Sequence, residues 1–313
     1  MREKRVDTRT MPRLYVPDFK HREGLRQRLK DVYLRVLGLP FYQRRVEAHI
    51  LFGCLGNIDG KRVLNIGCGD GIFDIEMARR GAKIEAIDLC RGALERARWR
   101  ADQLGLALNI NFVHGNATHL PYRDSTFDVV ISNCVIEHIP ADQQVLKEVS
   151  RLLKPAGKLV ITVPREFENW DRIPARLAKL LISAPNWLKR KICSDPIIQA
   201  TSFRGYVDLV LVPYKQVRVG YSEAEIEEKM GLAGLRLIGV KGYLKMYGAW
   251  GVDVLEGFSA LKVVYGGDFG YMAKHDWLYG LLFPVLYLIS FLDDTLGRKA
   301  PSMAMIVTTE KRD

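Results

Sequence analysis

A glycine loop between an apolar run and a helical pattern constrains the fold of this chain more than any other feature. Residues 62–67 are an apolar run typical of a buried strand, and glycines stand at Gly67, Gly69 and Gly71. A helical pattern then begins, over residues 72–80. Glycine lets the backbone turn tightly and lets a ligand lie against it without interference from a Cβ atom. The pattern therefore predicts a strand, a ligand-binding turn and a helix.

A second apolar run, residues 83–88, ends in a carboxylate, Asp88. An acid at this place, beside a glycine turn, predicts a nucleoside pocket in which the carboxylate accepts hydrogen bonds from ribose hydroxyls. A dinucleotide site needs G-x-G-x-x-G, but Ile72 stands where the last glycine would be. The loop also lacks the Lys-Ser/Thr pair of a phosphate-binding P-loop. A glycine cluster with no ligand is the alternative that the loop alone leaves open.

Three later segments carry a family resemblance. They are Gly-Asn-Ala-Thr-His-Leu-Pro-Tyr at 115–122, Ser-Thr-Phe-Asp-Val-Val-Ile-Ser-Asn-Cys-Val-Ile-Glu-His at 125–138, and Leu-Lys-Pro-Ala-Gly-Lys-Leu-Val-Ile-Thr-Val-Pro at 153–164. Together with the glycine loop and Asp88, they resemble the motifs of class I S-adenosylmethionine (SAM) dependent methyltransferases, in the same order. The resemblance covers about residues 63–164. It implies a SAM-binding core and methyl-transfer activity.

The resemblance also implies which residues hold SAM: Asn65, Gly67, Cys68, Gly69, Gly71, Asp88, Leu89, Asn116, Ala117 and Asn133. Two of them depart from the family pattern. The family usually has Asp or Glu at the position of Asn65, facing the methionyl ammonium, and Asp at the position of Asn116, near the adenine. Asparagine keeps an acceptor oxygen but loses the charge, so we expect weaker SAM binding. The alternative is a chain that has kept the fold and lost catalysis.

Alternating strand and helix patterns predict an α/β fold with a doubly wound parallel sheet, and the resemblance implies that this sheet is Rossmann-like, with seven strands of which the last is antiparallel. The first five strands are expected near 62–67, 83–88, 110–114, 127–132 and 158–163, with helices over 72–80, 91–104 and 141–153. A further helix begins after Ser222, which can form a capping box with Glu225. Strand six is expected over 235–244 and an antiparallel strand seven over 303–309.

The predicted organisation has six parts. They are a basic N-terminal helical segment (1–50), the SAM-binding core (51–164), a cap insertion (165–220), the core helix with strand six (221–245), an apolar cap or membrane-facing insertion (246–301), and strand seven with a tail (302–313). Both insertions leave the carboxyl edge of the sheet, where ligands bind in such folds. We expect them to cover the substrate.

Charge and apolar composition suggest what kind of surface or ligand the cap contacts. The formal net charge of +11 favours an anionic surface or ligand. Residues 277–292 contain no charge, but sixteen residues with Gly280 and Pro284 are too few and too broken for a membrane span, which needs about twenty. Basic amphipathic segments within 173–192 fit the surface of an anionic membrane. A buried helical hairpin with a solvated basic face is the alternative reading of these segments.

Cysteine usage and the start of the chain bear on location. The chain has five cysteines and no C-x-x-C pair, which argues against a disulfide framework or a zinc site and for a reducing compartment. The first residues form no apolar signal segment. The expected location is the cytoplasm, with a peripheral position on the cytoplasmic membrane face as the extension of the membrane hypothesis.

Glu137 and His138 are the candidate catalytic pair, because a histidine that titrates near neutrality can act as a general base. Their alternative role is a structural polar cap. Some relatives bind a divalent metal with an E-x-x-E-H cluster, but Cys134 replaces the first acid here, so no metal site is expected. Tyr206, Tyr214 and Tyr221 are weaker candidates.

Three functions stay open from the sequence. The first is SAM-dependent methyl transfer to a lipophilic or lipid-linked small molecule, such as a quinone precursor, at a membrane surface. The second is a soluble small-molecule O- or N-methyltransferase with a closed apolar cap. The third is a degenerate SAM-binding scaffold or partner subunit. Nucleic acid is not the expected partner, because the chain shows no RNA-binding module or zinc finger.

Overall fold

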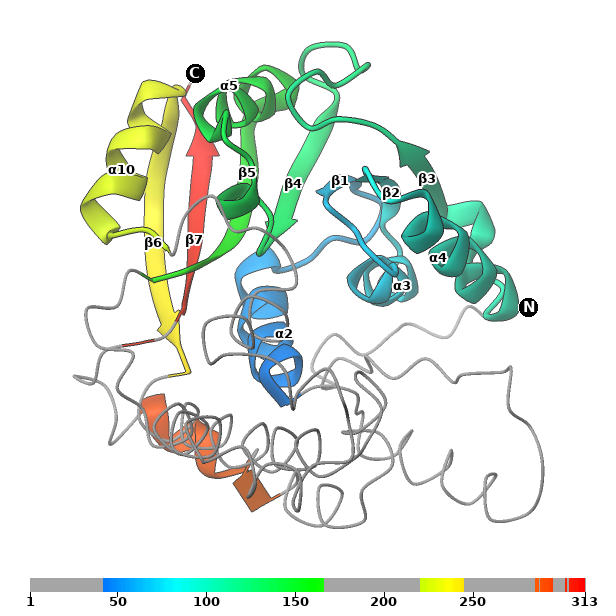
Figure 1. Cartoon of the computed structure of the whole chain (residues 1–313), viewed down its shortest axis with the longest axis horizontal. Coiled ribbons are helices and arrows are strands. Elements are labelled where there is room, and N and C mark those ends of the chain that lie inside the picture. Colours follow the sequence, from blue (N-terminus) through cyan, green and yellow to red (C-terminus); the bar gives the residue numbers. More distant parts are fainter. Residues whose placement is uncertain are drawn as a thin grey trace, which may run out of the picture.

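A seven-stranded sheet with helices on both faces forms the body of the protein (Figure 1). The computed structural model describes residues 42–165, 220–244, 285–286, 288–294, 302 and 304–312, with the backbone alone for 42–45. The basic N-terminal segment before residue 42, nearly all of the 165–220 insertion and most of the 246–301 insertion therefore lie outside the described residues.

The strands follow the predicted order. Their bounds are β1 Arg62–Ile66, β2 Lys83–Asp88, β3 Ile110–His114, β4 Phe127–Asn133, β5 Leu153–Pro164, β6 Leu235–Tyr243 and β7 Ala304–Lys311. They are arranged β3-β2-β1-β4-β5-β7-β6, with the first five parallel and β7 antiparallel to both of its neighbours. The predicted Rossmann-like sheet is confirmed. The strand order reverses between β1 and β4, which is where such sheets bind ligands.

Strand β5 begins earlier than the pattern predicts, at Leu153 rather than near residue 158. Leu153 pairs with Phe127 before a shift in register, and both side chains are fully buried. Ala156, with φ of 56°, and Gly157 form the irregular stretch between the two parts of the strand. Apolar burial therefore extends the strand across residues that look like a turn in the sequence.

Helices cover the two faces of the sheet unequally. On one face lie α2 (Tyr42–Leu55), α3 (Ile72–Arg79) and α4 (Arg91–Gln103), and on the other lie α5 (Asp142–Leu152) and α10 (Glu223–Leu232). Short 3-10 helices occur at η1 (Ala107–Asn109), η2 (Ile136–His138) and η4 (Phe291–Asp294). Ser222 caps α10 by accepting a hydrogen bond from the Glu225 amide at 3.1 Å, as predicted.

Helix α2 runs from the carboxyl edge of the sheet toward the amino edge. Near its end, the carbonyl of Cys54 accepts a hydrogen bond from Lys158 Nζ at 3.3 Å, toward the amino end of the paired part of β5. Near its start, Glu47 contacts Cys134, just past the end of β4. Figure 1 shows α2 in blue, beside the arrowhead of β4. The helix crosses residue 50, so the N-terminal helical region and the core are continuous here.

Candidate cofactor site and the neighbouring carboxyl edge

Two glycines of the loop after β1 have different physical roles. Gly67 has φ of 73°, and a Cβ atom there would lie 2.3 Å from Cγ2 of Val135. Gly69 has φ of 53°, but a Cβ atom there would meet nothing within 4 Å. Both backbone conformations favour glycine. Gly67 is thus required by packing within the protein, whereas Gly69 leaves a bare stretch of backbone against which a ligand can lie.

Asp88 ties the end of β2 to the glycine loop. Its Oδ2 accepts a hydrogen bond from the Gly69 amide at 2.8 Å, and its Oδ1 accepts one from the Cys90 amide at 2.8 Å. No ion pair with Asp88 occurs in the part of the chain that the structure describes. The carboxylate is half-buried, and each of its oxygens can accept a further hydrogen bond. These free acceptor positions could receive hydrogen bonds from the ribose hydroxyls of SAM, as the sequence predicts.

The other predicted cofactor residues fall at the same edge of the sheet. Leu89, directly after β2, exposes 66% of its surface, which is unusual for an apolar side chain beside a loop of polar groups. After β3, Asn116 is exposed and its Oδ1 accepts a hydrogen bond from the Thr118 amide at 3.0 Å, while Ala117 is buried. Asn133 ends β4 and accepts a hydrogen bond from the Thr162 hydroxyl. The fold brings all of these together, and their contacts with the cofactor stay a prediction.

A buried carboxylate that the sequence analysis did not select lies beneath the loop. Asp74, the third residue of α3, is fully buried, and both of its oxygens accept hydrogen bonds from Asn65 Nδ2 at 2.9 Å. Burial raises the pKa of Asp74 to about 7. Burial, followed by Asp74 and then Asp88, also raises the pKa of the Cys68 thiol far above its usual range. In the sequence, Asp74 resembles an ordinary acid in the first turn of a helix.

The candidate catalytic pair lies in η2. Glu137 is buried, and its Oε1 lies 3.9 Å from Nε2 of His138. Burial lowers the pKa of His138, so its imidazole is neutral near pH 7 and able to accept a proton. The catalytic role of the pair stays a prediction. Within the described residues no group of three or more His, Cys, Asp or Glu side chains is arranged to hold a metal ion.

A second polar cluster at the carboxyl edge escaped the sequence analysis. We call Glu47, Cys134, Thr162 and Tyr243 the Glu47 cluster. Glu47 is fully buried, and its Oε1 accepts hydrogen bonds from the Tyr243 hydroxyl at 2.9 Å and from Cys134 Sγ at 3.6 Å. Cys134 has φ of 51°, and its amide donates to the Thr162 hydroxyl at 3.0 Å. Glu47 thus lies fully buried beside a residue in a strained backbone conformation just past the end of β4.

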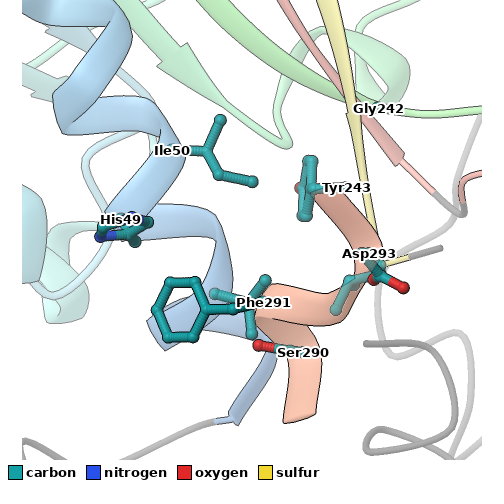
Figure 2. A pocket seen from close by; sticks show the side chains of 9 residues that line it. His49, Ile50, Gly242, Tyr243, Ser290, Phe291 and Asp293 are labelled. Carbon is teal, nitrogen blue, oxygen red and sulfur yellow. The ribbon is translucent and has the colours of Figure 1, made fainter. Parts of the chain in front are cut away.

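A pocket lies at the end of β6, as Figure 2 shows, and Tyr243 of the Glu47 cluster is among its lining residues. Most of its lining is apolar, and the polar contributions come from His49, Tyr243, Ser290 and Asp293. The rings of His49 and Phe291 meet edge to face, with centroids 5.2 Å apart. The pocket therefore joins α2, β6 and η4, three elements that are distant in the sequence.

Tyr221 lies in the protein core, where its hydroxyl is 3.4 Å from the Ile136 carbonyl of η2. It is fully buried between β5 and α5, where its hydroxyl donates a hydrogen bond to Asp142 Oδ2 at 2.9 Å. Asp142 also accepts a hydrogen bond from Lys229 Nζ at 3.0 Å. These contacts join α5 and α10 on the face of the sheet opposite α2 and α3. Tyr206 and Tyr214 lie outside the described residues.

Comparisons with known proteins agree with this geometry. Residues 57–205 match the family model of a methyltransferase domain. The ubiquinone biosynthesis O-methyltransferase of Aeromonas salmonicida is 36% identical over 134 residues, which cover 43% of this chain and 53% of that protein. The ubiquinone/menaquinone biosynthesis C-methyltransferase UbiE of Haemophilus ducreyi is 32% identical over 126 residues, covering 39% and 49%. The chain thus spans about half the length of these two curated relatives.

Solved structures share the fold. Phosphoethanolamine N-methyltransferase 2 of Haemonchus contortus, in complex with SAM, superposes with a TM-score of 0.52 at 18% sequence identity, covering 84% of this chain and 52% of that one. At this level of identity the likeness concerns the fold alone. The sheet order and the loop after β1 agree with the matched family model, and residues 57–205 carry a methyltransferase domain.

Proposed function

We propose that this chain binds SAM at the carboxyl ends of β1 to β4 and transfers its methyl group to a small-molecule acceptor. The observation that carries the proposal is the contact between Asp88 and the Gly69 amide, beside an open glycine backbone. This contact sets a carboxylate with spare acceptor capacity next to a surface free of side chains. A nucleoside fits such a place, and Leu89 offers an exposed apolar surface for its base.

Different residues of the chain would bind the cofactor and activate the acceptor. When bound, SAM supplies a methyl group made electrophilic by the adjacent sulfonium. Asp88 and the glycine loop orient the nucleoside, and orientation together with exclusion of water provides much of the acceleration in such reactions. An oxygen acceptor needs a base, for which His138 is our candidate because its imidazole is neutral near pH 7. Glu137, 3.9 Å from His138, would orient the ring.

Calorimetric titration with SAM and with S-adenosylhomocysteine tests the cofactor part. We expect micromolar binding of both, abolished by Asp88→Ala. Asp124→Ala is the matched control, because that exposed acid pairs with Arg151 away from the loop. Unchanged binding in Asp88→Ala, or no binding by the unmodified protein, would contradict the assignment of this site.

The acceptor, in our proposal, is lipophilic and is reached at a membrane surface. The two relatives named above are described as quinone biosynthesis enzymes, and quinone precursors are apolar. In the described part of the chain no helix has the length and apolar character needed to cross a bilayer.

An exposed apolar stripe supports the proposed contact with a membrane surface. Val285, Leu288 and Leu292 expose 55%, 65% and 38% of their surfaces. They follow one another at three and four residues, so in a helical segment they share a face. Leu286 is buried and Phe291 packs against His49, which anchors the opposite face of the segment to α2. An apolar face held outward beside the pocket is suited to insertion into the headgroup region of a bilayer.

Flotation with liposomes, with and without anionic lipid, tests the membrane proposal. We expect the protein to float with anionic liposomes and Leu288→Glu to float less. Leu232→Glu is the matched control, because Leu232 on α10 is equally exposed, at 64%, on another part of the surface. Equal flotation of the two variants would mean that the apolar stripe does not contact the membrane. Failure of the unmodified protein to float would favour a soluble enzyme with a closed apolar cap.

A further inference from the structure

The carboxylates around the glycine loop differ in their counter-charges. Asp70 pairs with Arg96 at 2.9 Å and with Arg100 at 3.0 Å. Asp74 and Asp88 have no cationic partner among the residues that the structure describes. Asp88 is half-buried and within reach of solvent, but Asp74 is fully buried. A buried acid without a cation is costly, so Asp74 calls for an explanation.

Asn65 connects this acid to the loop. Its Nδ2 donates to both oxygens of Asp74 at 2.9 Å, while its Oδ1 is buried and has no hydrogen-bond partner in the described structure. A carboxylate accepts hydrogen bonds only, so the amide nitrogen faces Asp74 and the amide oxygen faces away from it. A hydrogen bond to an anion polarises the amide and makes its oxygen a better acceptor. The pair therefore presents a strengthened acceptor two residues before Gly67.

A hydrogen-bond donor with positive charge would complement both Asn65 Oδ1 and the Asp74 carboxylate. A neutral donor would satisfy Asn65 Oδ1 but would leave the charge of Asp74 unbalanced. The raised pKa of Asp74, about 7, is what burial without a nearby cation produces, and the nearest titratable groups, Cys68 and Asp88, supply no positive charge. Within SAM the α-ammonium combines both properties.

We propose that Asp74 acts through Asn65 as the anion that balances the α-ammonium of bound SAM. Asp74 is thus a positioning residue, and it restores from α3 a charge that Asn65 lacks on β1. This inference rests on the proposed function. The family usually has an acid at position 65, on β1. In our proposal the acid stands instead at position 74, on α3, and cofactor binding is kept.

A pair of ligands isolates this effect. S-adenosylhomocysteine carries the α-ammonium, and methylthioadenosine shares its adenosine but lacks the amino-acid part. We expect Asp74→Asn to weaken binding of S-adenosylhomocysteine by about tenfold and to leave binding of methylthioadenosine within about twofold, since the variant loses the anion that balances the ammonium and only the first ligand carries an ammonium. Asp88→Asn is the control that should weaken both ligands, because both carry the ribose.

Exchanging the two side chains completes the test. The double variant Asn65→Asp with Asp74→Asn keeps one acid and one amide in the buried pair. We expect it to bind S-adenosylhomocysteine within about threefold of the unmodified protein, even if Asp74→Asn alone does not fold. Equal losses for both ligands in Asp74→Asn would mean a purely structural role and would overturn the inference, as would no loss for either. If the unmodified protein binds neither ligand, the proposed function itself fails.

Discussion

The two polar regions at the carboxyl edge of the sheet differ in how far along the chain their partners lie. At the ends of β1 and β2, Gly69 and Asp88 are 19 residues apart, and Asn65 and Asp74 are 9 apart. In the Glu47 cluster, Glu47 is 87 residues from Cys134 and 196 from Tyr243. The first region is assembled within one strand–helix–strand unit. The second forms only when α2, β4 and β6 have all packed onto the sheet.

This difference separates two kinds of chemistry. The first region consists largely of backbone amides and carboxylates around bare glycines, which suits a ligand common to a whole family. The second consists of side chains from distant elements beside a small pocket, so it depends on packing that is particular to this protein. If that division holds, changes at the first region alter cofactor affinity, and changes at the second alter stability or acceptor use at constant cofactor affinity.

The largest expected effect concerns Asp74 and pH. Its folded-state pKa of about 7 lies above the ordinary value of 3.8, so the folded protein holds this proton more tightly than the unfolded chain. The contribution of Asp74 to stability is therefore fully present below about pH 4 and is lost as pH rises toward 7. The loss is on the order of 4 kcal/mol in the unfolding free energy.

Urea unfolding of the unmodified protein and of Asp74→Asn across pH 4 to 8 measures that contribution. As pH rises over this range, the unfolding free energy of the unmodified protein should fall relative to that of Asp74→Asn. The difference between the two unfolding free energies should be constant above about pH 8. A difference independent of pH would mean that Asp74 titrates normally.

Substitution of the loop glycines sharpens the comparison further. Gly67→Ala should lower the unfolding free energy by about 3 kcal/mol, because its Cβ would clash with Val135 at a positive φ. Gly69→Ala, with open space around its Cβ, should cost about 1 kcal/mol from the backbone alone and should chiefly weaken S-adenosylhomocysteine. Thermal unfolding and calorimetry on the two variants separate these effects. Equal losses of stability would contradict the packing role of Gly67.

The smallest effect is expected in the Glu47 cluster. Glu47→Ala should cost about 2 kcal/mol, because the buried Tyr243 hydroxyl loses its acceptor, and Tyr243→Phe about 1 kcal/mol. Both variants should bind S-adenosylhomocysteine within about twofold of the unmodified protein. A tenfold loss of cofactor affinity in Glu47→Ala would mean that the Glu47 cluster contributes to cofactor binding, and would contradict the division between the two regions.

Much of the core could be read from local patterns. The alternation of apolar runs and helical periodicities predicted the first five strands, and the family resemblance added the last two. The capping box at Ser222 was visible because its two residues are three positions apart. The glycine loop and Asp88 were visible for the same reason, since short spacing makes a local motif.

Asp74 and the Glu47 cluster were not visible, and the reason is physical. An acid in the first turn of a helix looks the same whether it faces solvent or a buried amide. Only the packing of α3 against β1 shows that Asp74 meets Asn65. In the same way, nothing near Glu47 in the sequence indicates a tyrosine at the end of β6.

The sequence by itself determined the class of fold, the strand and helix order, and the edge at which a nucleoside would bind, because these depend on residues close together in the chain. Tertiary structure alone decided which acids are buried without cations and which polar side chains meet at the ends of β4 to β6. Burial and long-range contact set the electrostatic cost of a charge, and neither is encoded in the spacing of neighbouring residues.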